Sequence, residues 1–157
     1  MKILYVIIMM LFLGMVSCSE DNLKGYSSSN CIQFDKLSKD STVFSFAYDE
    51  TLESGTVALK LVMISPLVDR DRKYNVKFLQ DESSAQAGVD FEMPAEEQVI
   101  AANDSVAYLN VIVKRNKALK GSAIAVFEVQ VSDDFMPGIE ANRKGRIFIT
   151  NQLTRPG

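Results

Sequence analysis

The chain of 157 residues has no histidine and no tryptophan, and it has only two cysteines and four prolines. Histidine is the commonest general base and a common ligand of transition metals, so its absence removes both kinds of chemistry. No Ser–His or Cys–His pair for nucleophilic catalysis can form. We therefore expect the protein not to be an enzyme and to need no cofactor. The absence of tryptophan also removes the ring best suited to stacking on sugars.

Positive charge is scarce as well. Lysine and arginine together number 17 against 20 acidic residues, which gives a net charge of −3. A protein that binds duplex nucleic acid usually carries a basic surface, so we expect no nucleic-acid partner. The 47% of hydrophobic residues excludes a disordered chain, and the length fits one domain rather than two.

The N-terminal segment 1–17 has the pattern of a secretory signal peptide. One positive charge, at Lys2, precedes an apolar run over 3–16, and the small residue Ser17 stands before Cys18. The run is about 14 residues long, whereas a helix needs about 20 to cross a bilayer. We expect a cleaved signal rather than a permanent membrane helix.

The junction Met15-Val16-Ser17-Cys18 resembles a bacterial lipobox, in which the signal peptide is cut before a cysteine that then carries lipid. The resemblance implies that Cys18 is lipidated and anchors the protein to a membrane, because two or three acyl chains bind a bilayer almost permanently. Cys31 would then be a lone thiol. The alternative is an ordinary secreted protein in which Cys18 pairs with Cys31.

Residues 18–30 are polar after the cysteine and have almost nothing to bury, which is typical of a flexible tether. The acidic pair Glu20-Asp21 resembles the export signal that sends Bacteroidetes lipoproteins to the outer face of the outer membrane. This implies a lipid-anchored, surface-exposed protein of the cell outer membrane. The alternative is that the acidic pair only keeps the linker solvated.

From Cys31 onward the apolar residues alternate with polar ones, which is typical of β-strands, and no window shows a sustained helical period. Turn-forming residues separate the alternating segments. The predicted strands cover residues 31–34, 42–47, 56–64, 73–79, 98–101, 105–114, 123–132 and 146–150.

Seven or eight short strands in roughly 125 residues fit an all-β fold. We therefore predict a single immunoglobulin-like β-sandwich over residues 31–157, after the signal peptide and the tether. The spacing of the strands alone leaves a small barrel open as the alternative.

Two turns stand out by their composition. The alternating charges of segment 69–72, Asp-Arg-Asp-Arg, predict a solvated hairpin turn, with an ion site as the alternative. In segment 83–91, Gly88 can adopt a positive φ, Asp90 can cap the turn with its carboxylate, and Phe91 can close the end of the sandwich.

Segment 85–91, with its Ala-Gly-x-Asp-aromatic pattern, is similar to the turn between sandwich strands in Calx-beta domains. Together with segment 66–71 leading into Tyr74, and segment 134–138 before the last strand, it resembles domain-of-unknown-function family 4843 of Bacteroidetes surface lipoproteins. Members of that family often occur beside starch-utilisation-type outer-membrane uptake systems. The resemblance therefore implies partners in an outer-membrane uptake complex, or a glycan, by association only.

The leading functional hypothesis is an accessory binding or interaction module on the cell surface. Tyr108 and Ile112 are predicted to point outward from one strand, where an aromatic–aliphatic pair can dock a protein partner.

One alternative is a carbohydrate-binding component of a glycan-uptake system, since tyrosine rings can serve as platforms for sugars. The candidate rings are Tyr26, Tyr48, Tyr74 and Tyr108.

Another alternative, suggested by the Calx-beta resemblance, is a calcium-dependent adhesive module. Calcium needs six to eight oxygen ligands, and several carboxylates must converge to supply them. The candidates follow two strands and are expected to meet at one end of the sandwich: Asp81, Glu82, Asp133 and Asp134.

Overall fold

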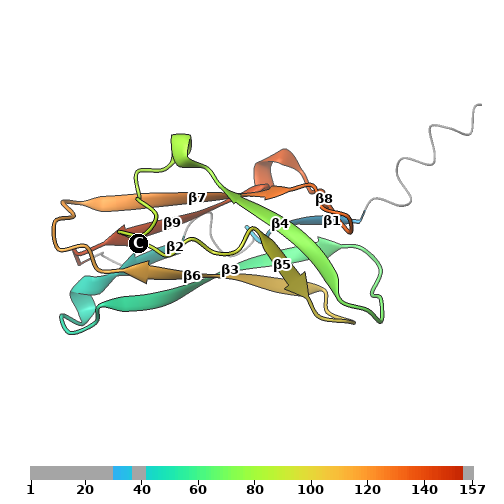
Figure 1. Cartoon of the computed structure of the whole chain (residues 1–157), viewed down its shortest axis with the longest axis horizontal. Helices are drawn as coiled ribbons and strands as arrows, with labels where there is room; N and C mark the ends of the chain where they lie inside the picture. The colour runs from blue at the N-terminus through green and yellow to red at the C-terminus, as the bar shows by residue number, and fades with distance from the viewer. Residues whose placement is uncertain (1–29, 37–41, 154–157) are drawn as a thin grey trace, which may run out of the picture.

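Two β-sheets face each other in the computed structural model of the chain, which describes residues 30–36 and 42–153 (Figure 1). The predicted signal peptide 1–17, Cys18 and all of the predicted tether except Asn30 lie outside the described residues. Within the described residues, no helix is long and apolar enough to cross a membrane.

The four-stranded sheet has the order β6-β3-β1-β8. Its long pair is β3 (Ser54–Ile64) and β6 (Val106–Lys114), which run antiparallel along the lower part of Figure 1. On the other side of β3 lies the short antiparallel β1 (Cys31–Phe34), followed by the two-residue parallel strand β8 (Met136–Pro137). The strand β6 is thus one edge of this sheet.

The five-stranded sheet has the order β2-β9-β7-β4-β5. Its centre is the antiparallel set of β4 (Arg72–Phe78), β7 (Ser122–Gln130) and β9 (Lys144–Thr150). One edge is the parallel strand β2 (Thr42–Ser45), and the other is β5 (Glu97–Ile100). Short 3-10 turns follow β2 and β4 and precede β9: η2 (Phe46–Tyr48), η3 (Gln80–Glu82) and η4 (Glu140–Asn142).

The all-β sandwich is confirmed, and every predicted strand is present. The predicted strand 42–47 is too long, because the chain turns at residue 46, where the hydroxyl of Ser45 accepts a hydrogen bond from the Ala47 N–H. The strand β8 was not predicted, since two residues are too few to show an alternation.

The core between the sheets consists of the apolar residues that alternate with polar ones along the strands. Along β6, Ala107, Leu109, Val111 and Val113 are buried, while the residues between them face outward. Each fully buried aliphatic or aromatic side chain contributes about 1.5–3 kcal/mol relative to an exposed one. The two sheets are therefore held together mainly by this apolar layer, and the outer faces are left for other roles.

Candidate functional site

The outer face of the four-stranded sheet carries the two residues predicted to bind a partner. Tyr108 is 54% exposed and Ile112 is 40% exposed, so both point outward as the alternation indicates. Tyr108 lies opposite Lys60 of β3, and Ile112 lies opposite Thr56. On this face the aromatic and aliphatic side chains therefore stand beside polar ones.

Lys60 does not leave a free positive charge on this face. Its ammonium lies 3.0 Å from the carboxylate of Asp35, and this hydrogen-bonded ion pair raises the pKa of Lys60. The surface around Tyr108 is therefore close to neutral, which favours an apolar contact over an ionic one.

The four predicted calcium ligands do not meet. Asp81 and Glu82 lie in η3, after the last residue of β4, whereas Asp134 accepts a hydrogen bond of 2.8 Å from the backbone N–H of Lys73 at the start of β4. The two acidic pairs are thus separated by most of the length of β4, roughly 17 Å. The prediction that they converge was wrong, because β4 and β7 are antiparallel and their ends lie at opposite ends of the sandwich.

Two of these acids are also already paired with cations. A carboxylate oxygen of Glu82 lies 2.6 Å from the ammonium of Lys144, and Asp134 lies 2.7 Å from the guanidinium of Arg70. Residues 30–36 and 42–153 contain no group of three or more His, Cys, Asp or Glu side chains arranged to hold a metal ion. Cys31 is a free thiol there.

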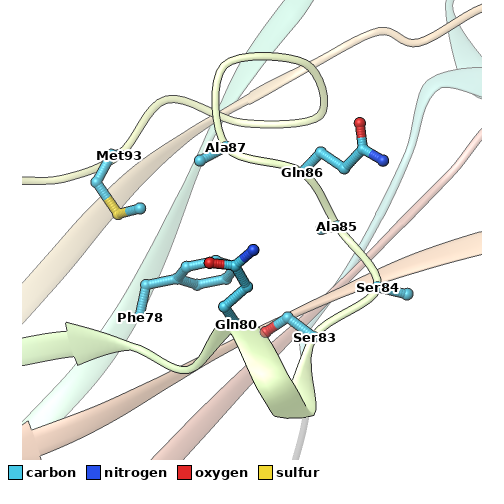
Figure 2. Close-up of a pocket in the computed structure, with 8 residues that line it drawn as sticks. All are labelled: Phe78, Gln80, Ser83, Ser84, Ala85, Gln86, Ala87 and Met93. Carbon is cyan, nitrogen blue, oxygen red and sulfur yellow. The ribbon is translucent and has the colours of Figure 1, made fainter.

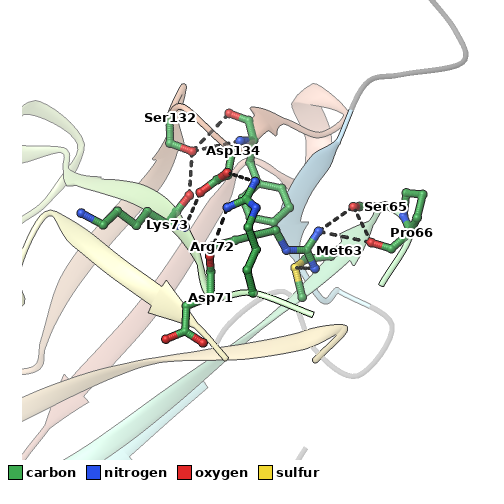
Figure 3. A network of polar contacts seen from close by, with 10 residues as sticks. Met63, Ser65, Pro66, Asp71, Arg72, Lys73, Ser132 and Asp134 are labelled. Atoms are coloured by element: carbon green, nitrogen blue, oxygen red, sulfur yellow. Dashed lines mark hydrogen bonds and ion pairs between the residues drawn. The ribbon is translucent and has the colours of Figure 1, made fainter. Parts of the chain in front are cut away.

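The charged segment 69–72 is only partly the solvated turn that was predicted. Arg72 is 2% exposed, and its guanidinium donates to the Ser65 hydroxyl at 2.7 Å and to the Pro66 carbonyl at 3.3 Å (Figure 3). The guanidinium donates to the Asp104 carbonyl as well, at 3.3 Å. It also lies over the ring of Phe135, with 4.9 Å between Cζ and the ring centroid. The charge pattern of the segment does not predict this role, because it describes Arg72 as solvated and does not show the contact with Asp104, 32 positions away.

Arg70, whose side chain is 62% exposed, extends the same network toward the surface through its ion pair with Asp134. The hydrogen bond from Arg70, helped by the one from the Lys73 N–H, lowers the pKa of Asp134. The network ties the start of β4 to the turn after β7. It is a structural clasp, in which both terminal nitrogens of the Arg72 guanidinium donate hydrogen bonds while the buried Arg72 Nε has no partner among the described residues.

Segment 83–91 behaves as predicted. Gly88 has φ +83°, and Asp90, only 3% exposed, accepts hydrogen bonds from the Gln86 N–H at 2.8 Å and the Asn116 side-chain amide at 2.9 Å. Phe91 is fully buried, and its ring centroid lies 4.9 Å from that of Phe78. The turn therefore closes one end of the sandwich.

A pocket of about 430 Å³ lies beside this turn (Figure 2). The Phe78 ring, the Gln80 and Gln86 amides and the Met93 thioether line it, with no charged side chain among its lining residues. Neither glutamine side chain makes a hydrogen bond within the described chain, whereas the hydroxyls of Ser83 and Ser84 accept from backbone N–H groups of β7. The lining residues all lie within segment 78–93, but the turn-forming pattern of that segment does not show that its side chains enclose a hollow.

The candidate tyrosine platforms differ from one another. Tyr74 is 1% exposed, and burial raises its pKa to about 12, so its prediction as a platform was wrong. Its place on the inner side of β4 puts the ring in the core. Tyr48 and Tyr108 are exposed, and Tyr26 lies outside the described residues.

Several solved structures share the fold at low sequence identity. The chain matches the apo form of the Calx CBD1 domain with a TM-score of 0.59 and 9% identity, over 80% of this chain and 100% of that one. The Calx CBD2 domain matches with a TM-score of 0.52 and 11% identity, over 76% and 85%. A candidate carbohydrate-binding protein from Bacteroides ovatus matches with a TM-score of 0.51 and 13% identity, over 78% of this chain and 37% of that one.

No curated protein matches the chain by sequence. Residues 24–157 do match a family defined as "Domain of unknown function (DUF4843)". This match spans most of the chain, including every described strand. The protein is therefore a member of the DUF4843 family, with a Calx-beta-like sandwich as its fold.

Proposed function

We propose that this protein is a non-catalytic binding module, held at the cell outer membrane through lipid on Cys18, that docks a protein of an uptake complex. The docking surface is the outer face of β3 and β6 around Tyr108 and Ile112. The observation that carries the proposal is the exposure of both side chains, 54% and 40%, on one face of the sheet, where the ammonium of Lys60 opposite Tyr108 is paired with Asp35. Exposed apolar side chains grouped on one face are typical of interaction sites.

The test of docking replaces Tyr108 and Ile112 together by serine. We expect the double variant to fold normally, because both side chains are exposed, and to lose at least tenfold in recovery of outer-membrane partners from detergent-solubilised membranes. The matched control is Val99→Ser on β5, which is 58% exposed on the other sheet and should leave recovery unchanged. Equal recovery by the wild type and the double variant would contradict the docking face.

The anchor is tested separately by protease treatment of whole cells. Wild-type protein is expected in the membrane fraction and accessible to protease, and Cys18→Ala is expected to leave that fraction. Membrane-bound but protected protein would place the domain on the periplasmic side, and would redirect the search toward periplasmic partners.

The pocket in Figure 2 favours a second candidate function, the binding of a neutral carbohydrate. Sugars are bound by an apolar surface with a few convergent polar groups, and this pocket offers the Phe78 ring with two amides that are free to hydrogen-bond. The candidate carbohydrate-binding protein among the similar folds supports the same class of ligand.

The carbohydrate hypothesis is tested on a glycan array with the wild type and with Gln80→Ala plus Gln86→Ala. Binding that falls at least fivefold in the double variant, but not in Gln152→Ala, would support the pocket. An array that stays blank at high protein concentration would exclude this function.

A further inference from the structure

The strand β6 is an edge of the four-stranded sheet, and among residues 30–36 and 42–153 the chain covers this edge only at its C-terminal end. There the Glu92 N–H donates to the Ile112 carbonyl, and the Lys114 N–H donates to the Asp90 carbonyl, both at 2.8 Å. After Glu92 the chain reaches Pro94 and crosses to β5 in the other sheet. No described segment pairs with the first half of this edge.

The alternating direction of backbone N–H and C=O groups along a strand shows which residues of β6 have theirs on the open edge. In an antiparallel strand, successive residues direct their N–H and C=O groups to opposite sides. The backbone groups of Ile112 and Lys114 form their hydrogen bonds on the side of β6 that faces away from β3. The residues at the same alternate positions therefore direct their backbone groups to that side as well: Val106, Tyr108 and Asn110. Within the described residues, no backbone hydrogen bond reaches these three from that side.

The side chains along this edge lack the usual protection against strand pairing. Natural edges are commonly blocked by lysine, proline or a bulge. Here the residues of the open stretch are valine, tyrosine and asparagine, while Pro94 and Lys114 lie in or beyond the part already covered. The open edge carries no charge, so a second copy can approach it without like-charge repulsion, even though the chain has a net charge of −3.

We propose that two copies of this protein pair through their β6 edges, antiparallel and about a twofold axis at Tyr108. In this register Val106 faces Asn110 of the second copy, Tyr108 faces Tyr108, and every outward backbone group of the three residues gains a partner. Pairing ends before Ile112, where Glu92 already occupies the edge. The two exposed tyrosine rings become cross-strand neighbours, an arrangement that is stabilising in sheets.

The inference goes beyond the docking role, because it concerns the edge of β6 and not the face of the sheet. Pairing would place the Tyr108–Ile112 faces of both copies on the same side of one continuous eight-stranded sheet. A partner could then meet two docking faces at once.

The test uses disulfide formation between two differently tagged copies of the full chain, co-expressed in cells. One copy carries Val106→Cys, the other carries Asn110→Cys, and both carry Cys31→Ser to remove the existing thiol. Facing residues of a hydrogen-bonded antiparallel pair have Cα atoms about 5.5 Å apart, which is within disulfide range. The same residue in the two copies would be separated by roughly 13 Å in this register.

We expect the mixed pair to give at least fivefold more disulfide dimer under mild oxidation than either variant expressed alone. Ala58→Cys, exposed on the adjacent β3, replaces Val106→Cys in the matched control and should give only background. Tyr108→Lys, added to both copies, would bring two like charges together and abolish the dimer without lowering the melting temperature. Equal dimer in the mixed pair, the single variants and the Ala58 control would overturn the proposal. The docking test does not depend on this outcome, since it measures recovery of other proteins.

Discussion

The two ends of β4 are held by opposite kinds of chemistry. At its start, the guanidinium of Arg72 is buried among oxygens of residues 65, 66 and 104 and lies against the Phe135 ring. At its end, the ring of Phe78 packs against Phe91 and Phe127, with centroid distances of 4.9 and 5.6 Å. One strand of seven residues thus joins a polar clasp to an aromatic cluster.

Substitutions at the two ends of β4 should lower the stability of the fold for different reasons. The aromatic cluster depends on volume, so a smaller side chain leaves a cavity. The polar clasp depends on direction, so losing the donor leaves part-buried hydrogen-bond acceptors without their partner. The clasp contains the carboxylate of Asp134, whose pKa is lowered in the fold, so the clasp should lose stability as the pH falls.

The largest effect is expected at the aromatic end. Phe91→Ala removes a fully buried ring and should lower the free energy of unfolding by about 3–5 kcal/mol. Urea denaturation followed by circular dichroism measures the change. Val89→Ala, two residues away and 47% exposed, is the control and should change stability by less than about 0.5 kcal/mol. A loss below 1 kcal/mol in Phe91→Ala would mean that the cluster does not close the sandwich.

The next effect is expected at the polar end. Arg72→Met keeps the apolar stem but removes the donors to Ser65, Pro66 and Asp104, and should cost about 2–4 kcal/mol. The control is Arg70→Met, whose side chain is 62% exposed and should cost at most about 1 kcal/mol. The same urea titration compares the two. Equal losses in the free energy of unfolding would mean that the buried Arg72 stabilises the fold no more than the exposed Arg70.

The smallest effect should depend on pH. The folded protein lowers the pKa of Asp134 through Arg70 and the Lys73 N–H, so this carboxylate stabilises the fold above its unfolded pKa of about 4, and that contribution is lost as pH falls through the lower folded value. Asp134→Asn should therefore melt below the wild type at pH 7, and the gap should narrow between pH 4 and pH 2. Thermal melts at several pH values measure it. If the difference in melting temperature between the two proteins does not change with pH, the ion pair between Arg70 and Asp134 is not its cause.

The fold was predictable because its signals are local. Alternation identifies the buried residues of β6, and the turn at 85–91 uses Gly88 and Asp90 as their conformational preferences indicate. Arg72 was misjudged because the same signals describe a charged residue as solvated. Its oxygen partners lie up to 32 positions away in the sequence, and no local rule brings them together.

Neighbouring residues along the chain are enough to set the period of the strands, the chemistry of the turns and the resemblance to a lipoprotein family. The packing of the two sheets is what separates Asp81 from Asp134 and leaves half of the β6 edge without a partner among the described residues. These properties depend on which strands become neighbours and in which direction they run. Burial of the apolar layer sets that arrangement for the whole chain at once.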